Sequence, residues 1–428
     1  FILYFMRILF ISQVFWPDTS SVAQHLWDLA EVLQKQGHTV SAYSSRYPYE
    51  SKHIKYPSSE NHQGVTIERI NHTGFGKSSV IGRLIDFFTF NALIFFKLLF
   101  LPRKKYDLII GTTVPPFLSF IGVIIAKWKK IPFHYWVMDM QPELAIASNM
   151  IKPNSFAAKL FTVIGNYTIQ KATLLFALDK YMKTRLIERG AKPEHIYVCP
   201  IWPVMDVVYD GERMQNPFRI EHGFGNKIVI MYSGNHAYVH PLDTLLAAAL
   251  DLKDDSQFLF VFIGGGVRKK DVSNFKNKHN LSNIIQLPYQ PRNTIHLSLG
   301  SADLQVVIMG NGQVGFTHPN KIYGSLFIGK PIIYIGPSPS HITDILNNLT
   351  GNIHVAHGES QRLVVELKKF ACNSEANNQD IGKLNRSFTE VHYNPDKLKE
   401  EMVTIIENNT NQLASKQYSF HNLTDNHI

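Results

Sequence analysis

The sequence predicts an α/β fold made of two doubly wound domains in tandem. The chain has 428 residues, too many for one ordinary hydrophobic core and suited to two domains of about 200 residues each. Patterns of buried strands and amphipathic helices alternate up to about residue 200 and begin again at Lys227, as in parallel sheets covered by helices. We expect one domain over 1–205 and another over 226–385, then a helix over 386–410 and a polar, disordered tail over 411–428.

Charge and cysteine content narrow the possible functions. The net charge is +9, but Lys and Arg are spread along the chain, with short clusters at 103–105, 127–130 and 268–270. This suits phosphorylated small molecules or an anionic membrane surface better than nucleic acid. The two cysteines are far apart and show no metal-ligand spacing, so we expect no metal site, no disulfide framework and a cytoplasmic protein. The apolar start, with Arg7 in its middle, is interpreted as a first strand rather than a signal peptide.

The first strand, over 7–12, is followed by a loop and an amphipathic helix that ends at Gly37. Ligands of such sheets bind beyond the carboxyl ends of the parallel strands. The loop residues Asp18, Ser20 and Ser21 are therefore candidates for contacts with a ligand. For Ser21 the alternative, capping of the helix, is favoured.

The segment over 84–101 is almost wholly apolar and aromatic, and basic residues 103–105 follow it directly. It holds Asp86, Asn91 and Lys97, so it falls short of a membrane-spanning helix. Two interpretations remain open, a helix lying on a membrane surface and a helix buried in the domain. The first would place the protein peripherally on the inner face of the cell membrane.

A buried strand over 132–138 ends in Asp139, and Glu143 follows a few residues later. A carboxylate at the end of a buried parallel strand is either a site residue or a loop cap, and Asp139 is interpreted as the former. Glu143 is a weaker candidate for binding the acceptor. His134, inside the strand, is expected to be a satisfied core residue.

Two loops of the second domain have the composition of a phosphate site. Gly234 and Asn235 follow one strand, and the next strand ends in the triplet 264–266, with Arg268 and Lys269 close behind. Glycines allow a backbone to approach a phosphate, and the cations would offset its charge. Tyr289, after the following strand, either faces a nucleotide base or only packs.

The stretch 313–336 contains a loop, a helix opened near Asn320 and Lys321, a stop at Gly329 and Pro331, and a buried strand. Backbone N–H groups at such a helix start, with one cation, form a site for a diphosphate. The alternative is a plain turn with Lys321 in solvent.

Taken together, these segments resemble the retaining glycosyltransferases of the GT-B fold, family 4 (glycosyl transferases group 1), in the branch that builds bacterial surface polysaccharides. The resemblance covers 7–370 and rests on the motifs QVFWPD (13–18), TTVPPF (112–117), MDMQPE (138–143), RGAKPEHIYVCPIWPVMD (189–206), YSGNH (232–236), IGGG (263–266) and HPNKIYGSLFIGKP (318–331).

The resemblance implies two Rossmann-like domains, a nucleotide-diphosphate sugar held mainly by the second, and an acceptor held by the first. It also implies transfer with retention, without a metal or cofactor, and a last helix that crosses back to the first domain. The donor residues that it implies are Gly234, Asn235, Gly264, Gly265, Gly266, Arg268, Tyr289, Thr317, His318, Pro319, Asn320, Lys321 and Tyr323.

The chain departs from the family pattern. Where the family carries a pair of glutamates, this sequence has Phe316 and Gly324. No Asp or Glu lies between Asp303 and Asp344. We expect a glycosyltransferase (EC 2.4) of hexosyl or N-acetylhexosaminyl type that uses a UDP- or GDP-type donor and a lipid-linked or polysaccharide acceptor. Lys321 would stabilise the leaving diphosphate, and Asp139 would orient hydroxyl groups. The alternatives are a catalytically silent partner protein and, last, a sugar-nucleotide epimerase.

Overall fold

The computed structural model describes residues 5–48, 54–75, 80–205 and 207–424, and the chain divides into two compact units. Unit 1 consists of Phe1–Pro142, Phe156–Pro200 and Pro395–Ile428. Unit 2 consists of Glu143–Ser155 and Ile201–Asn394. Each unit is built around its own sheet, and each is described by itself.

Unit 1 contains an eight-stranded sheet in the order β3-β4-β2-β1-β5-β6-β7-β8. Only β3 pairs antiparallel to its neighbour; the other pairs are parallel. The strand order reverses between β1 and β5, so the carboxyl ends of these two strands form the switch point of the sheet. The strands are β1 (Arg7–Ile11), β2 (Thr39–Ser45), β3 (Ser59–His62), β4 (Val65–Ile70), β5 (Leu108–Thr112), β6 (Phe133–Trp136), β7 (Leu174–Ala177) and β8 (Ile196–Val198).

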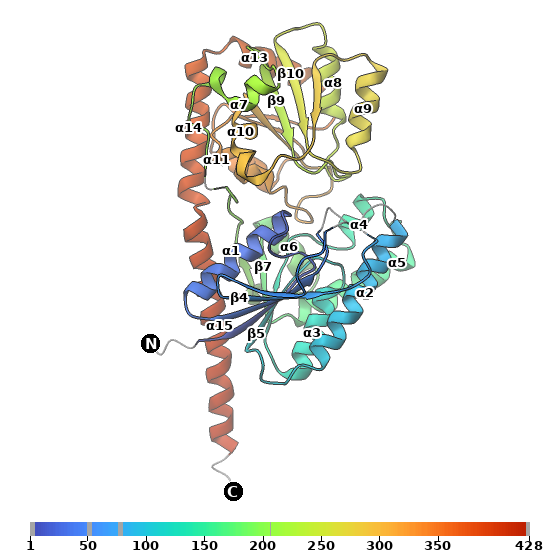
Figure 1. Cartoon of the computed structure of the whole chain (residues 1–428), viewed down its shortest axis with the longest axis vertical. Helices are drawn as coiled ribbons and strands as arrows, with labels where there is room; N and C mark the ends of the chain where they lie inside the picture. The colour runs from blue at the N-terminus through green and yellow to red at the C-terminus, as the bar shows by residue number, and fades with distance from the viewer. Residues whose placement is uncertain (1–4, 49–53, 76–79, 206, 425–428) are drawn as a thin grey trace. The chain divides into compact units, whose positions relative to one another are not determined.

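Three helices of unit 1 form one packed layer. Helix α2 packs against α3, and α3 packs against α5, so the three lie side by side (Figure 1). Among the described residues, none of the helices is both long and apolar enough to cross a membrane. The helices of unit 1 are α1 (Ser21–Lys35), α2 (Val80–Leu99), α3 (Leu118–Lys129), α5 (Phe156–Lys171), α6 (Lys180–Glu188), the short η2 (Pro193–His195) and α15 (Pro395–Thr424).

Helix α15 closes unit 1 by packing along α1. Met402, Val403 and Ile406 are buried, and the His38 Nε2 atom lies 2.9 Å from a carboxylate oxygen of Glu407. The C-terminal helix therefore contacts the first domain, as the resemblance implies. The backbone stays helical beyond the predicted end near residue 410, because no Pro or Gly interrupts the chain after Pro395. The last four residues of the predicted tail lie outside the described residues.

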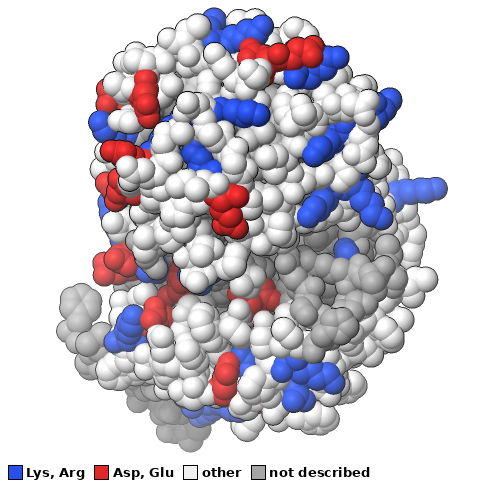
Figure 2. All heavy atoms as spheres, turned by 45° about the horizontal axis from the view of Figure 1, so that its top comes forward, with Lys and Arg blue, Asp and Glu red and all other residues white. Residues whose placement is uncertain are grey.

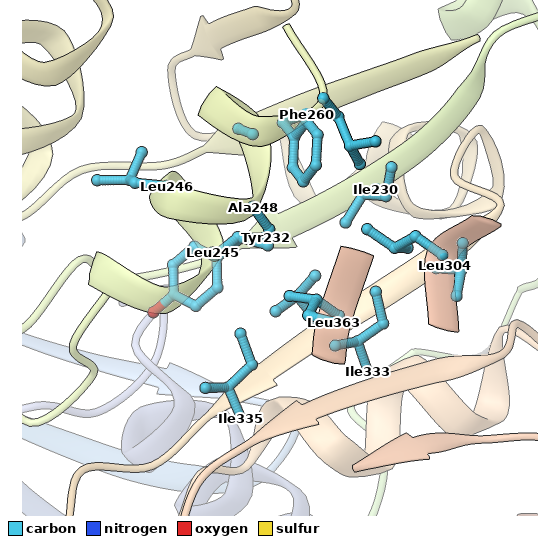
Figure 3. Close-up of a cluster of buried hydrophobic side chains, with 14 of the residues drawn as sticks. Ile230, Tyr232, Leu245, Leu246, Ala248, Phe260, Leu304, Ile333, Ile335 and Leu363 are labelled. Carbon is cyan, nitrogen blue, oxygen red and sulfur yellow. The ribbon is translucent and has the colours of Figure 1, made fainter. Parts of the chain in front are cut away.

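Unit 2 contains a six-stranded parallel sheet in the order β11-β10-β9-β12-β13-β14, with its switch point between β9 and β12. Apolar side chains from the sheet and from helices α8 and α13 meet in one core cluster (Figure 3). Both faces of the strands are buried, which matches their nearly continuous apolar runs. The strands are β9 (Ile228–Ser233), β10 (Phe258–Ile263), β11 (Ile284–Leu287), β12 (Leu304–Ile308), β13 (Ile332–Ile335) and β14 (Ile353–Val355).

The helices of unit 2 are α4 (Glu143–Ala147), η3 (Arg213–Gln215), α7 (Pro217–Glu221), α8 (Asp243–Asp251), α9 (Lys269–Lys278), η4 (Arg292–Thr294), α10 (Ile295–Gly300), α11 (Lys321–Phe327), α12 (His341–Leu346), α13 (Ser360–Cys372) and α14 (Glu375–His392). The segment 207–226, at the boundary between the two predicted domains, packs into unit 2. Its Phe218 and Phe224 are core residues, and the buried Arg219 pairs with Asp303. Asp206, at the end of one motif, lies outside the described residues.

Candidate functional site

Lys321 lies at the carboxyl edge of the unit 2 sheet, where it begins helix α11 after the loop that follows β12. Its ammonium is buried and finds no hydrogen-bond partner among the described residues. It lies 3.7 Å from the centroid of the Tyr232 ring, and burial lowers the pKa of Lys321 to about 7. A buried cation without a hydrogen-bonding acceptor is costly, so an anion bound here would stabilise its charged form.

Two histidines near Lys321 remain neutral. Burial, with a smaller contribution from the Lys321 charge, lowers the pKa of His236 to about 4 and that of His240 to about 3. His236 keeps one ring nitrogen 3.1 Å from the Gly265 carbonyl oxygen. Lys321 is therefore the residue that brings positive charge to this cluster of Tyr232, His236 and His240.

The glycines after β9 and β10 allow two loops to interlock. A Cβ atom on Gly264 would lie 2.1 Å from the Gly234 carbonyl oxygen, and one on Gly266 would lie 2.3 Å from the side-chain oxygen of Asn235. Both glycines have positive φ, +125° and +123°. From the sequence, Gly264 and Gly266 are predicted to allow a phosphate to approach the backbone. In the structure the loop carrying Gly234 and Asn235 fills that space, so their first role is loop packing.

Gly234 and Tyr289 border this loop pair. A Cβ atom on Gly234 would lie 3.3 Å from the Lys321 ammonium, so a side chain here would crowd the cation. The ring of Tyr289 covers Gly264 and Gly265, with its hydroxyl 3.4 Å from the Gly265 carbonyl oxygen. The ring is 42% exposed, which leaves part of it available for stacking.

Arg268, a predicted phosphate ligand, already has two carboxylate partners. Its guanidinium donates to Asp271 at 2.7 Å and to Asp243 at 3.1 Å. A phosphate would have to compete with both carboxylates for this side chain. On the face that Figure 2 draws, basic side chains are interrupted by acidic and uncharged ones and form no continuous basic track.

The loop before Lys321 is tightly packed. Thr317, His318 and Pro319 are buried, and the His318 Nε2 atom lies 2.8 Å from the hydroxyl of Tyr323, which is also buried. Asn320 occupies the N-cap position of α11 without a side-chain capping bond. Because α11 has only seven residues, its dipole is small, and the positive charge at its start comes mainly from Lys321.

A cavity of about 660 Å³ opens at the same edge of unit 2. Its walls come from the loops after β9, β12 and β14, among them Tyr238, Gly310, Gln313 and His357. The Gln313 side chain is buried, and its carbonyl oxygen accepts no hydrogen bond from any described residue. A ligand with hydroxyl donors would satisfy this oxygen.

In unit 1, Asp139 follows β6 at the carboxyl edge of the sheet. Burial raises the pKa of Asp139 to about 7, so this carboxyl is held ready to exchange a proton near neutral pH. His134, within β6, is buried, but neither ring nitrogen has a hydrogen-bond partner in the described part of the chain. The expectation of a satisfied core histidine is wrong on that point.

The other predicted acceptor residues are divided between the two units. Asp18 is buried, and its carboxylate accepts from the Ser20 backbone N–H at 2.8 Å. Ser20, rather than Ser21, occupies the N-cap of α1, and its side chain makes no capping bond; the predicted cap at Ser21 is wrong. Ser21 lies one residue inside the helix, with its hydroxyl 3.3 Å from the ring of His25. Glu143 begins α4, which clusters with unit 2.

Several residues of this site were missed by sequence reasoning. Tyr232 and His236 are the first and last residues of the YSGNH motif. Nothing in this motif indicates that both lie close to Lys321, which is 85 or more residues later in the chain. Gln313 was visible only as the first residue of the stretch before Lys321. What identifies it is burial without a partner, which is a property of the fold.

Comparisons with known proteins agree with this architecture. The profile of the glycosyl transferase 4-like domain matches residues 21–202. The chain is 21% identical to the putative colanic acid biosynthesis glycosyl transferase WcaI of Escherichia coli over 375 residues, which are 84% of this chain and 90% of that protein.

The chain is also 21% identical to the probable glycosyltransferase WbjE of Pseudomonas aeruginosa over 258 residues, 60% of this chain and 64% of that protein. Among solved structures, HepE from Anabaena in complex with UDP and glucose superposes with a TM-score of 0.67 at 14% identity. The match covers 94% of this chain and 100% of HepE.

Proposed function

The chain belongs to the group 1 glycosyltransferases of family 4, with the GT-B fold, and from this premise we propose that it transfers a sugar from a UDP- or GDP-type donor with retention of configuration. It is a nucleotide-sugar glycosyltransferase, and WcaI and WbjE are its homologues. We further propose a lipid-linked or polysaccharide acceptor in bacterial surface-polysaccharide synthesis, and a hexosyl or N-acetylhexosaminyl group as the sugar.

The observation that carries the proposal is the buried ammonium of Lys321. Transfer leaves negative charge on the departing nucleoside diphosphate, and a cation already desolvated next to it stabilises that charge more strongly than a cation in water. Binding of the diphosphate keeps Lys321 protonated, because a nearby anion raises a lysine pKa. The exposed part of the Tyr289 ring is available to a nucleotide base.

The missing glutamates require another acceptor for sugar hydroxyls. No carboxylate occurs from 304 to 343, so a neutral group must take this role within the stretch. We assign it to Gln313, which lines the 660 Å³ cavity and whose buried carbonyl oxygen has no hydrogen-bond partner among the described residues. A neutral acceptor stabilises developing positive charge at the sugar less than a carboxylate does, which predicts a slow enzyme rather than a silent one.

For the acceptor we propose Asp139, with Asp18 and Ser20 at the same carboxyl edge of the unit 1 sheet. With a pKa near 7, the Asp139 carboxyl can take a proton from an attacking hydroxyl and later release it to solvent. No role is left for a metal in this scheme.

The test is binding and turnover of a panel of UDP-, GDP-, dTDP- and CMP-sugars, measured by calorimetry and nucleotide release. We expect one donor to bind, and Lys321→Met to weaken binding by about 10- to 100-fold, the value of a hydrogen bond to a charged group. Lys253→Met, an exposed lysine of unit 2, is the matched control and should bind as the wild type does. If the wild type binds none of these donors, the proposal fails and a silent partner protein is the better interpretation.

A further inference from the structure

Helix α2 in unit 1 is apolar on its outward side as well as on its buried side. The buried side holds apolar residues such as Phe90 and Ile94, together with Asp86 and Asn91, whose side chains bond backbone groups of Phe75 and Pro116 at 3.0 Å. The outward stripe is entirely apolar, with Ile81 71%, Leu84 52%, Phe88 74% and Phe96 53% exposed. The outward side of a helix that faces water is normally polar.

The apolar surface continues across the two neighbouring helices. Helix α3 packs against α2, and α5 packs against α3. Together the three helices and the turn after α2 expose a set of large apolar side chains, which we call the apolar face: Ile81, Leu84, Ile85, Phe88, Leu93, Phe96, Phe100, Ile124, Trp128, Phe156, Leu160 and Val163. Scattered apolar residues are ordinary on protein surfaces, but a contiguous group of this kind marks an interaction site.

The charges around the apolar face are almost all positive. Five cations are exposed there, Arg103, Lys104, Lys105, Lys127 and Lys130. Lys129 is buried and donates to backbone carbonyls, and Lys97 is paired with Glu68. From 87 to 138 the chain holds one acidic residue, Asp107. That carboxylate is paired with Arg7 at 2.7 Å. In α5 no residue is acidic and Lys159 is exposed. The guanidinium of Arg103 lies 5.6 Å from the centroid of the exposed Trp128 ring, a pairing suited to the boundary between lipid headgroups and acyl chains.

We propose that the apolar face is a docking surface for a lipid bilayer with anionic headgroups. Helix α2 would lie in the plane of the membrane with its outward stripe among the acyl chains, while the exposed cations of 103–105, with Lys127 and Lys130, contact the headgroups. The inference goes beyond the transfer reaction and does not depend on which donor the protein uses.

A second copy of the chain fits this surface less well. A symmetric dimer would place the same patch against itself, so the cations around one apolar face would meet those of the other. Anionic headgroups complement the positive charge instead.

The test is co-sedimentation of the full chain with vesicles of phosphatidylcholine, with or without phosphatidylglycerol. We expect binding to the anionic vesicles that weakens at high salt. The double variant Phe88→Ser/Phe96→Ser and, separately, Lys104→Glu/Lys105→Glu should each reduce binding by about tenfold or more. The matched controls change exposed residues of unit 2, Val365→Ser/Val391→Ser and Lys253→Glu/Lys278→Glu, and should leave vesicle binding unchanged.

Three outcomes would overturn the proposal. The first is a wild type that does not sediment with anionic vesicles. The second is sedimentation of the two patch variants as full as that of the wild type. The third is self-association in analytical ultracentrifugation that Phe88→Ser/Phe96→Ser abolishes. The last result would assign the apolar face to a second copy. Circular dichroism confirms that each variant is folded, and donor binding by unit 2 is measured separately, so failure here is distinct from failure of the transferase proposal.

Discussion

The amino group of Lys321 is buried, and burial disfavours its charged form. Burial lowers the pKa of Lys321 to about 7 from 10.5, so the neutral amine predominates above pH 7 in the unliganded protein. A bound diphosphate raises that pKa again. Ligand binding and protonation of Lys321 are therefore coupled.

This coupling predicts that donor affinity falls as pH rises. Below pH 7 the ammonium is already charged, so binding takes up no proton. Above pH 7 each binding event must protonate Lys321, and the Kd of the donor should rise by up to about tenfold per pH unit. Calorimetry in buffers of different ionisation enthalpy, at about pH 6 and about pH 9, measures the proton uptake directly.

A nucleotide sugar is the right probe, because its diphosphate is esterified at both ends and does not titrate in this range. We expect close to one proton taken up at the higher pH and almost none at the lower. Lys321→Met should remove the difference. Equal proton uptake at both pH values in the wild type would contradict the coupling.

The sequence indicated Lys321, Gly234 and Tyr289 as residues near a donor, because motif order locates loops at strand ends. It did not indicate Gln313, His236 or His240, because their significance comes from burial and from neighbours distant in the chain. For Arg268 the charge and position suggested phosphate binding, and this stays a prediction; the sequence did not indicate that the fold also supplies it with Asp243 and Asp271. Partners acquired through folding are not visible in a linear motif.

At the scale of elements, α11 is held by α14 through two glycines. A Cβ atom on Gly382 of α14 would lie 2.0 Å from the Gly329 carbonyl oxygen, just after the end of α11. Gly329 has a φ of +72°, the left-handed conformation expected of a helix stop. On the same side, the Asn385 side chain donates to the Lys330 carbonyl oxygen at 2.9 Å. The short helix that begins with Lys321 is thus supported by a longer one.

We predict that Gly382→Ala loosens α11. The added methyl group meets backbone rather than a flexible side chain, so the cost should be about 1–3 kcal/mol. Hydrogen exchange of 321–328 should become faster, and donor affinity should fall with it, because the position of Lys321 is then less well fixed. Ser387→Ala, at an exposed position of the same helix, is the control. If the hydrogen-exchange rate of 321–328 were unchanged in Gly382→Ala, the contact between Gly382 and Gly329 would not stabilise α11.

Strand and helix alternation was predictable because periodicity and Gly or Pro stops are local signals. The outward apolar stripe of α2 was harder to predict. A run of apolar residues does not indicate which of its sides packs against the rest of the domain, so the sequence left a membrane-surface helix and a buried helix both open. Likewise, the length of α15 was underestimated because polar composition resembles a tail, although no residue in it breaks a helix.

At the scale of the molecule, unit 1 is assembled from three separate segments of the chain, the last of which is α15. Ile406 is fully buried there, and the Tyr197 hydroxyl of η2–β8 and the His38 ring also contact this helix. The final segment is therefore part of the core of unit 1 rather than an appendage.

Ile406→Ala should accordingly destabilise unit 1 by about 2–5 kcal/mol. Four of the five tryptophans, at 16, 27, 128 and 136, belong to unit 1, so tryptophan fluorescence reports mainly on this unit during thermal unfolding. We expect its midpoint to fall by roughly 4–20 °C. Thr404→Ala, at an exposed position of α15, should leave the midpoint in place. If the midpoint fell equally in Ile406→Ala and Thr404→Ala, the loss of stability would come from a weaker helix and not from the buried contacts of Ile406.

The place of α15 in the sequence has a consequence for biosynthesis. The whole of unit 2 is translated before the helix that completes unit 1. Unit 2 is continuous from Ile201 to Asn394 apart from its short segment 143–155, so it can fold while the chain is still attached. Unit 1, although most of it is synthesised first, is completed only after α15 has been made and has packed against α1.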